Sequence, residues 1–282
     1  MRAMMVPVTA GATEGAPDDD PEGDADRTRP PRPPHGRGPT MSWLAAGLLA
    51  FDLETTGTDI ENDRIVTAAL VRLEPDGTVS REHHWLVDPG IPIPAQATAI
   101  HGIGTAQARE RGVAAAGAVE EITRSIAEAL GSGTPLVIMN ARYDLSLLDR
   151  ECRRHGVSPL SARLGGTPAP VIDPLVLDKH ADRYRRGKRN LQALCEHYGV
   201  VLDGAHQAGA DAVAAARVAR RLGEAFPAVG GVGLADLHAL QVRAAAEQAA
   251  SFQQYLRRTS DPQARIEPAW PVVPWPAAAA AG

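Results

Sequence analysis

Three patterns along the chain predict one α/β domain with a mixed sheet. Short apolar runs of strand length open the compact part, the first at Leu48 to Phe51. The Asp76-Gly77 turn joins two later runs and indicates an antiparallel meander. Strand-like and helix-like segments then alternate, which is typical of an α/β domain and not of a sandwich or a bundle. With 282 residues and 44% hydrophobic side chains, the chain can bury a sizeable core.

Five segments are predicted as strands. The first is a continuous apolar run, as expected for a strand that is buried on both faces. The second and third flank the Asp-Gly turn and alternate apolar with polar residues over part of their length. The predicted strands are Leu48 to Phe51, Asp63 to Leu73, Val79 to Val87, Leu136 to Met139 and Val171 to Asp173.

Six segments are predicted as helices because their apolar residues recur at helical spacing. In the first of them, Ile122, Ile126 and Leu130 share one face, and Gly131 follows as a typical end signal. The predicted helices are Val119 to Leu130, Tyr143 to His155, Pro174 to Ala181, Leu191 to Tyr198, Ala210 to Phe226 and Asp236 to Arg258.

The composition divides the chain into four parts. Residues 1–40 are expected to be a disordered arm, because an acidic run and then arginine and proline leave little to bury. Residues 41–228 form the expected folded domain, and 229–258 carry the last helix. Residues 259–282 are expected to be a flexible tail rich in proline and alanine. Met41 is a second candidate start codon beside Met1.

The formal net charge of −5 excludes a protein that binds nucleic acid through an overall basic field. Any such contact has to come from a local site. Two cysteines without the spacing of a zinc site fit a reducing compartment, so a cytoplasmic protein is expected. The apolar stretch near the start covers about eleven residues, against roughly twenty for a membrane span. The sequence therefore predicts no membrane anchor.

Asp52 and Glu54 are the most informative pair of residues. They lie two positions apart at the end of a predicted strand, so their carboxylates point to the same face. Two neighbouring carboxylates repel each other unless a cation lies between them. The alternative is a solvated strand edge before a Thr-Thr-Gly turn. It is disfavoured because solvated acids rarely interrupt an otherwise apolar, buried run.

Three short motifs resemble those of the DEDDh exonucleases, the group that includes the proofreading epsilon subunits of bacterial DNA polymerase III. The first is the stretch from Phe51 to Gly57, and the second runs from Asn140 to Asp144. The third is His206 followed five positions later by Asp211, with Ala208 between them. Each motif alone is weak, but the ordered set of three is specific. The resemblance covers Leu44 to Leu222.

The resemblance implies a ribonuclease H-like domain with a mixed five-stranded sheet flanked by helices. It also implies a 3′–5′ exonuclease that releases 5′-mononucleotides from DNA 3′ ends by metal-dependent phosphodiester hydrolysis. Its metal ligands would hold two ions, Mg²⁺ or Mn²⁺, which prefer hard oxygen donors, and no Cys/His cluster favours zinc. By resemblance these ligands are Asp52, Glu54, Asp144 and Asp211.

Two histidines compete for the role of general base. The resemblance assigns it to His206, since imidazole titrates near the working pH and this histidine precedes the acid of the third motif. His101 is the rival, with a structural alternative in which its ring caps backbone groups. We favour His206.

Substrate binding is expected around the Thr55-Thr56-Gly57 turn, which the resemblance brings to the terminal sugar, with His101 and Asn140 as further contacts. The basic stretch from Arg183 to Arg189 leaves two interpretations open, phosphate contact or a solvated loop between helices.

Three functions remain to be compared. A DNA exonuclease acting on a single-stranded or frayed 3′ end, alone or as a polymerase subunit, is preferred. An RNA exonuclease of the same family would use the same catalytic residues. A non-catalytic module that docks on a polymerase is disfavoured, because all five catalytic positions are filled.

Overall fold

The computed structural model describes residues 42–275. Its centre is a mixed sheet with the strand order β4-β3-β2-β1-β5-β6. β1 pairs antiparallel with β2, and β2 pairs antiparallel with β3, while β5 and β6 continue from β1 in parallel. The strands are β1 (Leu48–Thr55), β2 (Ile65–Leu73), β3 (Val79–Asp88), β4 (Val113–Ala114), β5 (Leu136–Val137) and β6 (Val171–Ile172).

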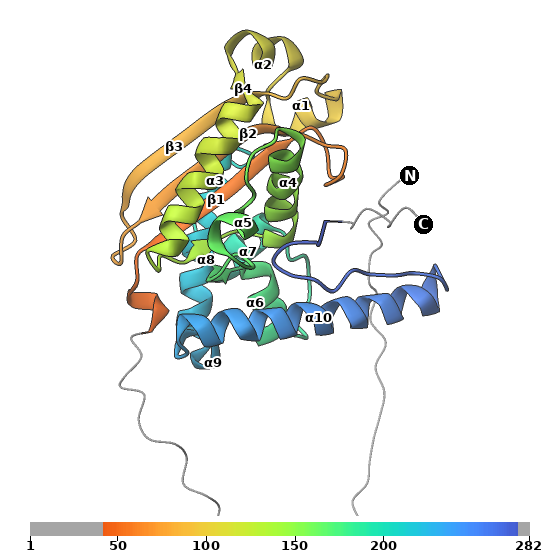
Figure 1. Cartoon of the computed structure of the whole chain (residues 1–282). Coiled ribbons are helices and arrows are strands. Elements are labelled where there is room, and N and C mark those ends of the chain that lie inside the picture. The colour runs from red at the N-terminus through yellow and green to blue at the C-terminus, as the bar shows by residue number, and fades with distance from the viewer. Residues whose placement is uncertain (1–41, 276–282) are drawn as a thin grey trace, which may run out of the picture. The chain divides into compact units, whose positions relative to one another are not determined.

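Helices cover both faces of this sheet, and a long helix, α10, crosses below it in the view of Figure 1. A short 3-10 helix, η1 (Trp43–Ala45), precedes β1. The α-helices are α1 (Ala95–His101), α2 (Thr105–Arg111), α3 (Ala115–Gly131), α4 (Ala141–Arg154), α5 (Leu160–Leu164), α6 (Pro174–Ala181), α7 (Leu191–Tyr198), α8 (Ala208–Ala225), α9 (Pro227–Gly230) and α10 (Leu234–Thr259).

The alternation of side chains along β1 divides the core into two layers. Phe51 and Leu53 pack with α3 and α4 on one face. Leu48 and Ala50 pack on the opposite face, with the buried alanines of α8. Asp52 and Glu54 continue the second series, so the strand's period of two directs them to the α8 side. The same alternation that builds the core thus determines where the two acids point.

The prediction of an α/β domain with a mixed sheet is confirmed, with one more strand than expected. The additional strand is the two-residue β4, which pairs in parallel with β3. The helices α1, α2, α5 and α9 are absent from the sequence-based prediction. They have four to seven residues each, too few for a helical repeat of apolar positions to appear. In contrast, the predicted bounds of α6 and α7 agree with the structure.

The segment after α10 differs from the expected flexible tail. Residues 260–275 fold back onto the domain, and Trp270 is buried in the α3–α4 core. Its ring nitrogen donates a hydrogen bond of 3.2 Å to the buried carboxylate of Asp173. Composition alone indicated a tail because proline and alanine show no periodicity. The predicted arm at 1–40, Met41 and the last residues, 276–282, lie outside the described residues.

Across residues 42–275, no helix combines the length and the apolar character that crossing a membrane requires.

Candidate active site

The C-terminal ends of β1, β5 and β6 meet at one edge of the sheet, since these three strands are parallel. Glu54 lies next to the last residue of β1, and Asp52 lies two residues earlier, both half-buried. Asn140 follows β5 and Asp173 follows β6. Topology therefore brings residues from distant parts of the sequence to this edge, where α/β folds place their ligands.

Asp144 reaches the edge from the first turn of α4. Asn140 precedes this helix with a left-handed backbone (φ 63°), which asparagine tolerates better than most residues. The buried carboxylate of Asp173 accepts hydrogen bonds of 3.0 Å from the N–H groups of Asn140 and Ala141 and so fixes the start of the helix. Asp144 is itself buried, and its Oδ1 accepts a 3.1 Å hydrogen bond from Leu53 N. This bond ties the second motif to the first.

His206 and Asp211 come from the loop before α8 and from the first turn of that helix. His206 is exposed and has a left-handed backbone (φ 67°), a rare conformation for a non-glycine residue that clusters at functional sites. Its N–H donates a 3.1 Å hydrogen bond to Asp211 Oδ2. The other oxygen, Oδ1, is buried without a hydrogen-bond partner among the described residues. An unpaired carboxylate oxygen of this kind is costly unless a cation or a donor meets it.

The four acids repel one another. Burial, followed by the charges of Asp144, Asp211 and Glu54, raises the pKa of Asp52 well above its ordinary value. Burial and the charge of Asp211 raise the pKa of Glu54 to about 7. Burial also raises the pKa values of Asp144 and Asp211. Four carboxyl groups with raised pKa values in one place form a site that lacks compensating positive charge.

These residues fit a divalent cation. One ligand atom each from Glu54, His206 and Asp211 lies within 4.8 Å of the others, a spacing at which a metal ion can be shared. Oδ1 of Asp211, which no described side chain or main-chain group meets, supplies a free ligand atom. Carboxylate oxygens are the donors that Mg²⁺ and Mn²⁺ prefer. The structure thus brings together all five residues that the sequence predicted for catalysis: Asp52, Glu54, Asp144, His206 and Asp211.

His101 lies at the end of α1, beside the same site. Its Nδ1 accepts a 3.1 Å hydrogen bond from Ile103 N, so the ring braces the turn after the helix. Burial lowers the pKa of His101, the carbonyl of Thr55 opposes this effect, and the charge of His206 adds to it. The contact with Ile103 N is the backbone-capping role that the sequence analysis gave as the alternative for this histidine.

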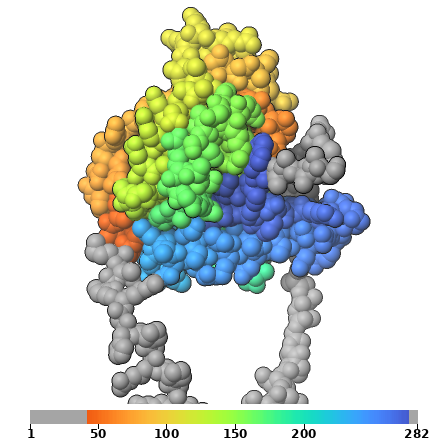
Figure 2. Space-filling model, viewed as in Figure 1, coloured from red at the N-terminus to blue at the C-terminus, as the bar shows by residue number. Residues whose placement is uncertain are grey.

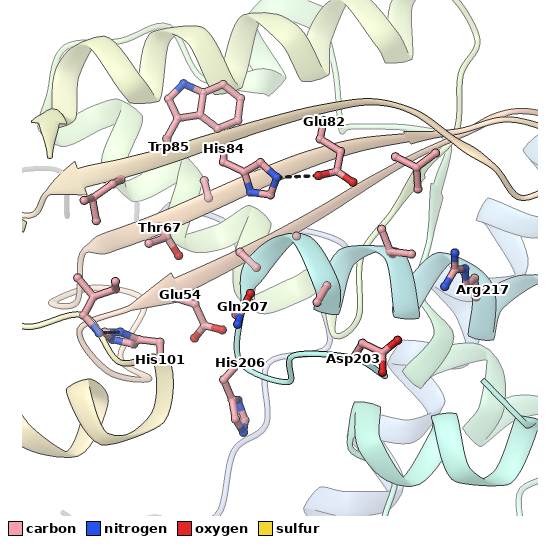
Figure 3. A pocket seen from close by; sticks show the side chains of 18 of the residues that line it. Glu54, Thr67, Glu82, His84, Trp85, His101, Asp203, His206, Gln207 and Arg217 are labelled. Atoms are coloured by element: carbon pink, nitrogen blue, oxygen red, sulfur yellow. Dashed lines mark hydrogen bonds and ion pairs between the residues drawn. The ribbon is translucent and has the colours of Figure 1, made fainter. Parts of the chain in front are cut away.

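An open pocket of about 600 Å³ extends from Glu54 between β3, α1 and the start of α8. Figure 3 shows Glu54, His101, His206 and Gln207 around it. His84 also lines the pocket, where its Nε2 lies 3.0 Å from Glu82 Oε2. The antiparallel register of β3 with β2, in which His84 faces Ala69, places this histidine there.

The Thr55-Thr56-Gly57 turn is tightly braced from within. Thr56 is buried, and its hydroxyl donates a 2.7 Å hydrogen bond to Asp63 Oδ1. A Cβ at Gly57 would lie 2.5 Å from Asp63 Oδ2, so the small residue makes room for that carboxylate. This contact gives a local, structural reason for a glycine at this position of the turn.

The basic stretch from Arg183 to Arg189 divides into two groups. Arg185 and Arg189 form ion pairs with Asp178, whose side chain is buried, and Tyr198 Oη donates a 2.8 Å hydrogen bond to the same carboxylate. These two arginines therefore brace the loop between α6 and α7. The remaining basic side chains are exposed, namely Arg183, Arg186 and Lys188.

The family model and the similar proteins of known sequence all point to exonucleases or DNA polymerase III proteins. A family model described as Exonuclease (RNase T) matches residues 49–219, more than half of the chain. A DNA polymerase III subunit epsilon-like protein of Rhodobacter capsulatus is 34% identical over 186 residues, which cover 64% of this chain and 24% of that protein. A PolC-type DNA polymerase III of Streptococcus pneumoniae is 31% identical over 180 residues, or 63% of this chain and 11% of the polymerase.

Solved structures share the fold at low sequence identity. Exonuclease I of E. coli, in complex with a dA16 oligonucleotide, has a TM-score of 0.55 at 21% identity, covering 65% of this chain and 42% of that one. Exonuclease I of Methylocaldum szegediense has a TM-score of 0.54 at 23% identity, covering 74% and 46%. These likenesses confirm the ribonuclease H-like α/β fold. The chain spans less than half the length of each of these four proteins.

The family model runs through all three motifs, and the fold gathers those motifs at one edge of its sheet. This chain therefore belongs to the DEDD exonuclease family.

Proposed function

We propose that this protein is a divalent-metal-dependent 3′–5′ exonuclease that releases 5′-mononucleotides from DNA 3′ ends. The observation that carries the proposal is the cluster of four carboxyl groups with an exposed histidine at its mouth, in which one buried carboxylate oxygen, Asp211 Oδ1, has no hydrogen-bond partner within residues 42–275. Asp52, Glu54, Asp144 and Asp211 would hold two ions, Mg²⁺ or Mn²⁺.

Bound divalent cations would supply the positive charge that a phosphodiester anion needs during attack by water. Asp52 lies among the other three acids, so its carboxylate is the natural centre of the ligand set. His206 is exposed on a loop, and its neutral imidazole can take the proton of the attacking water. The hydrogen bond from His206 N to Asp211 keeps the base beside the ligand set. The leaving 3′-oxygen receives its proton from solvent.

The terminal nucleotide would bind between the Thr55-Thr56-Gly57 turn, His101 and Asn140. His101 and Glu54 share one pocket wall, and the exposed Asn140 lies at the start of α4, close to Asp144. The preference for DNA is supported by the names of the relatives, which are DNA polymerase III proteins. A link to a polymerase and a cytoplasmic location are part of this proposal.

The test is a comparison of 5′-end-labelled single-stranded DNA and RNA of one sequence, each with Mg²⁺, Mn²⁺ or chelator. The proposal expects DNA to shorten from its 3′ end with 5′-mononucleotides as products, and expects chelator to stop the reaction. Faster shortening of RNA would replace DNA by RNA as the substrate. Cleavage from the 5′ end, or activity that survives chelation, would refute the proposed reaction.

A further inference from the structure

The chain after α10 passes across α4, the helix that carries Asp144. In Figure 1 this segment runs back from the end of α10 toward α4, and in Figure 2 its dark blue surface lies against the green region. Trp270 anchors it in the core, and Val273 N donates a 2.8 Å hydrogen bond to Ser146 Oγ on α4. We call residues 270–275 the strap.

Arg150 of α4 lies under the strap and is almost completely buried, with 1% of its surface exposed. A guanidinium group has five N–H donors, and here all five are used. Two donate to the carbonyls of Val273 and Pro274 in the strap, at 2.9 and 3.1 Å. Two donate to Glu61 Oε1, at 2.9 and 2.7 Å, and the fifth donates to Asp149. The ring of Trp275 covers the guanidinium at 5.2 Å.

Glu61 belongs to the loop of residues 57–64, which continues directly from the Thr55-Thr56-Gly57 turn. α4 contacts this loop at its start and in its middle. Tyr143 Oη donates a 2.6 Å hydrogen bond to Gly57 O, and Arg154 donates to Glu61 O at 2.9 Å. Arg150 adds the charged contact with the Glu61 side chain. One buried cation therefore connects the strap to the loop that begins at the candidate substrate turn.

We propose that Arg150 is a positioning residue that the strap completes, and that together they hold the loop of residues 57–64 in the form that binds the 3′-terminal nucleotide. The inference rests on the proposed exonuclease function. Without Val273 O and Pro274 O, two donors of a buried guanidinium lose their partners, which is unfavourable unless the side chain moves toward water. Such a movement releases Glu61, and the loop of residues 57–64 gains conformational entropy. Substrate binding then has to order the loop, which costs affinity.

We call the contacts of Arg150 with the strap and with Glu61 the clamp. Two variants break it, one on the strap side and one on the loop side, and neither changes an acid of the catalytic cluster. A chain ending at Val272 removes both strap carbonyls and Trp275, while it keeps the anchor Trp270. A control chain ending at Trp275 keeps every partner of Arg150. Glu61→Ala removes the loop side of the clamp, and this side chain is 41% exposed, so its loss leaves no buried cavity. The double variant combines both changes.

Hydrogen exchange by mass spectrometry on the metal-free proteins is the first measurement, and it does not depend on activity. The amides of residues 57–64 should exchange about tenfold faster in both single variants than in the control chain, with the rest of the sheet unchanged. Exchange at the control rate in this loop would overturn the proposal even if the enzyme is active. If the strap truncation lowers the melting temperature of the whole domain, the exchange rate of residues 57–64 in the Glu61→Ala variant decides whether the proposal holds.

Steady-state kinetics on single-stranded DNA is the second measurement. Each single variant should raise KM about tenfold with kcat within about twofold of the control, because the loop acts in binding. The double variant should be no worse than either single one, since both break the same clamp. A fall in kcat at unchanged KM, or effects that multiply, would contradict the clamp. An inactive control chain would refute the exonuclease function. The hydrogen-exchange rates of residues 57–64 would still show whether Arg150 and the strap hold this loop.

Discussion

The main-chain N–H of His206 donates a 3.1 Å hydrogen bond to Oδ2 of Asp211, whereas Oδ1 of the same carboxylate is buried and has no partner among the described residues. The five-residue step between them thus gives each oxygen a different role. Oδ2 holds the loop, and Oδ1 remains available to a cation. This division explains why a histidine and an acid at this spacing can form one functional unit.

Replacing Asp52 or Asp211 with alanine should lower nuclease activity by at least ~10²-fold, because the bound cations lose a ligand that balances charge during attack. The metal-free melting temperature should stay unchanged or rise, since burial penalises both carboxylates and the neighbouring acids add to this penalty at Asp52. Activity assays and thermal melting in chelator check the two statements. A variant with near wild-type turnover would remove that residue from the ligand set.

Asp144 should respond differently, because the N–H that donates to its carboxylate, that of Leu53, is buried, whereas the His206 N–H that donates to Asp211 is exposed. Asp144→Ala leaves that buried N–H unpaired and should cost about 1–3 kcal/mol of unfolding free energy. Asp144→Asn keeps an acceptor and should melt close to the wild type, while both variants lose activity. Denaturant unfolding of the pair provides the comparison. Equal stability of the two variants would show that the hydrogen bond contributes little.

The pH dependence of stability should follow the raised carboxyl pKa values. The pKa of Glu54 rises from 4.5 to about 7, so its stabilising contribution is complete below 4.5 and is lost as pH rises through about 7. The metal-free protein should therefore become less stable across this window. Glu54→Gln should flatten the decline, and Mg²⁺ should oppose it, because cations bind the ionised form. Melting curves in chelator that slope alike for the wild type and Glu54→Gln would contradict this assignment.

Deleting residues 1–40 should leave activity and melting temperature nearly unchanged. This segment has few apolar side chains with which to contribute to a core. A chain that starts at Met41 can be compared with the full chain in both assays. A large loss of either property would show that the segment binds substrate or packs on the domain.

The positions of the candidate catalytic residues could be predicted because short motifs place them next to strand ends and helix starts, where local sequence determines geometry. Asp52 and Glu54 follow the period of a strand, and Asp144 follows Asn140, whose left-handed backbone starts α4. In these cases the neighbouring residues carry most of the information.

Other features depend on contacts between distant residues. Arg150 looks like one more charged residue on a helix, and only the folded chain shows that Val273 and Pro274, more than a hundred positions later, accept its hydrogen bonds. The segment after α10 has the composition of a linker, yet the ring nitrogen of its Trp270 donates a hydrogen bond to the buried carboxylate of Asp173. Such pairings leave no periodic pattern in the sequence.

The most direct test of the catalytic assignment compares His206→Ala with His101→Ala by the rate at which each releases mononucleotides from the 3′ end of single-stranded DNA. Loss of the general base should lower the turnover of His206→Ala by roughly 10²–10⁴-fold, and raising the pH should restore part of it because hydroxide replaces the base. His101→Ala should lose much less, since its ring braces the turn at Ile103. A His101 variant slower than the His206 variant would contradict the account and move the base to His101.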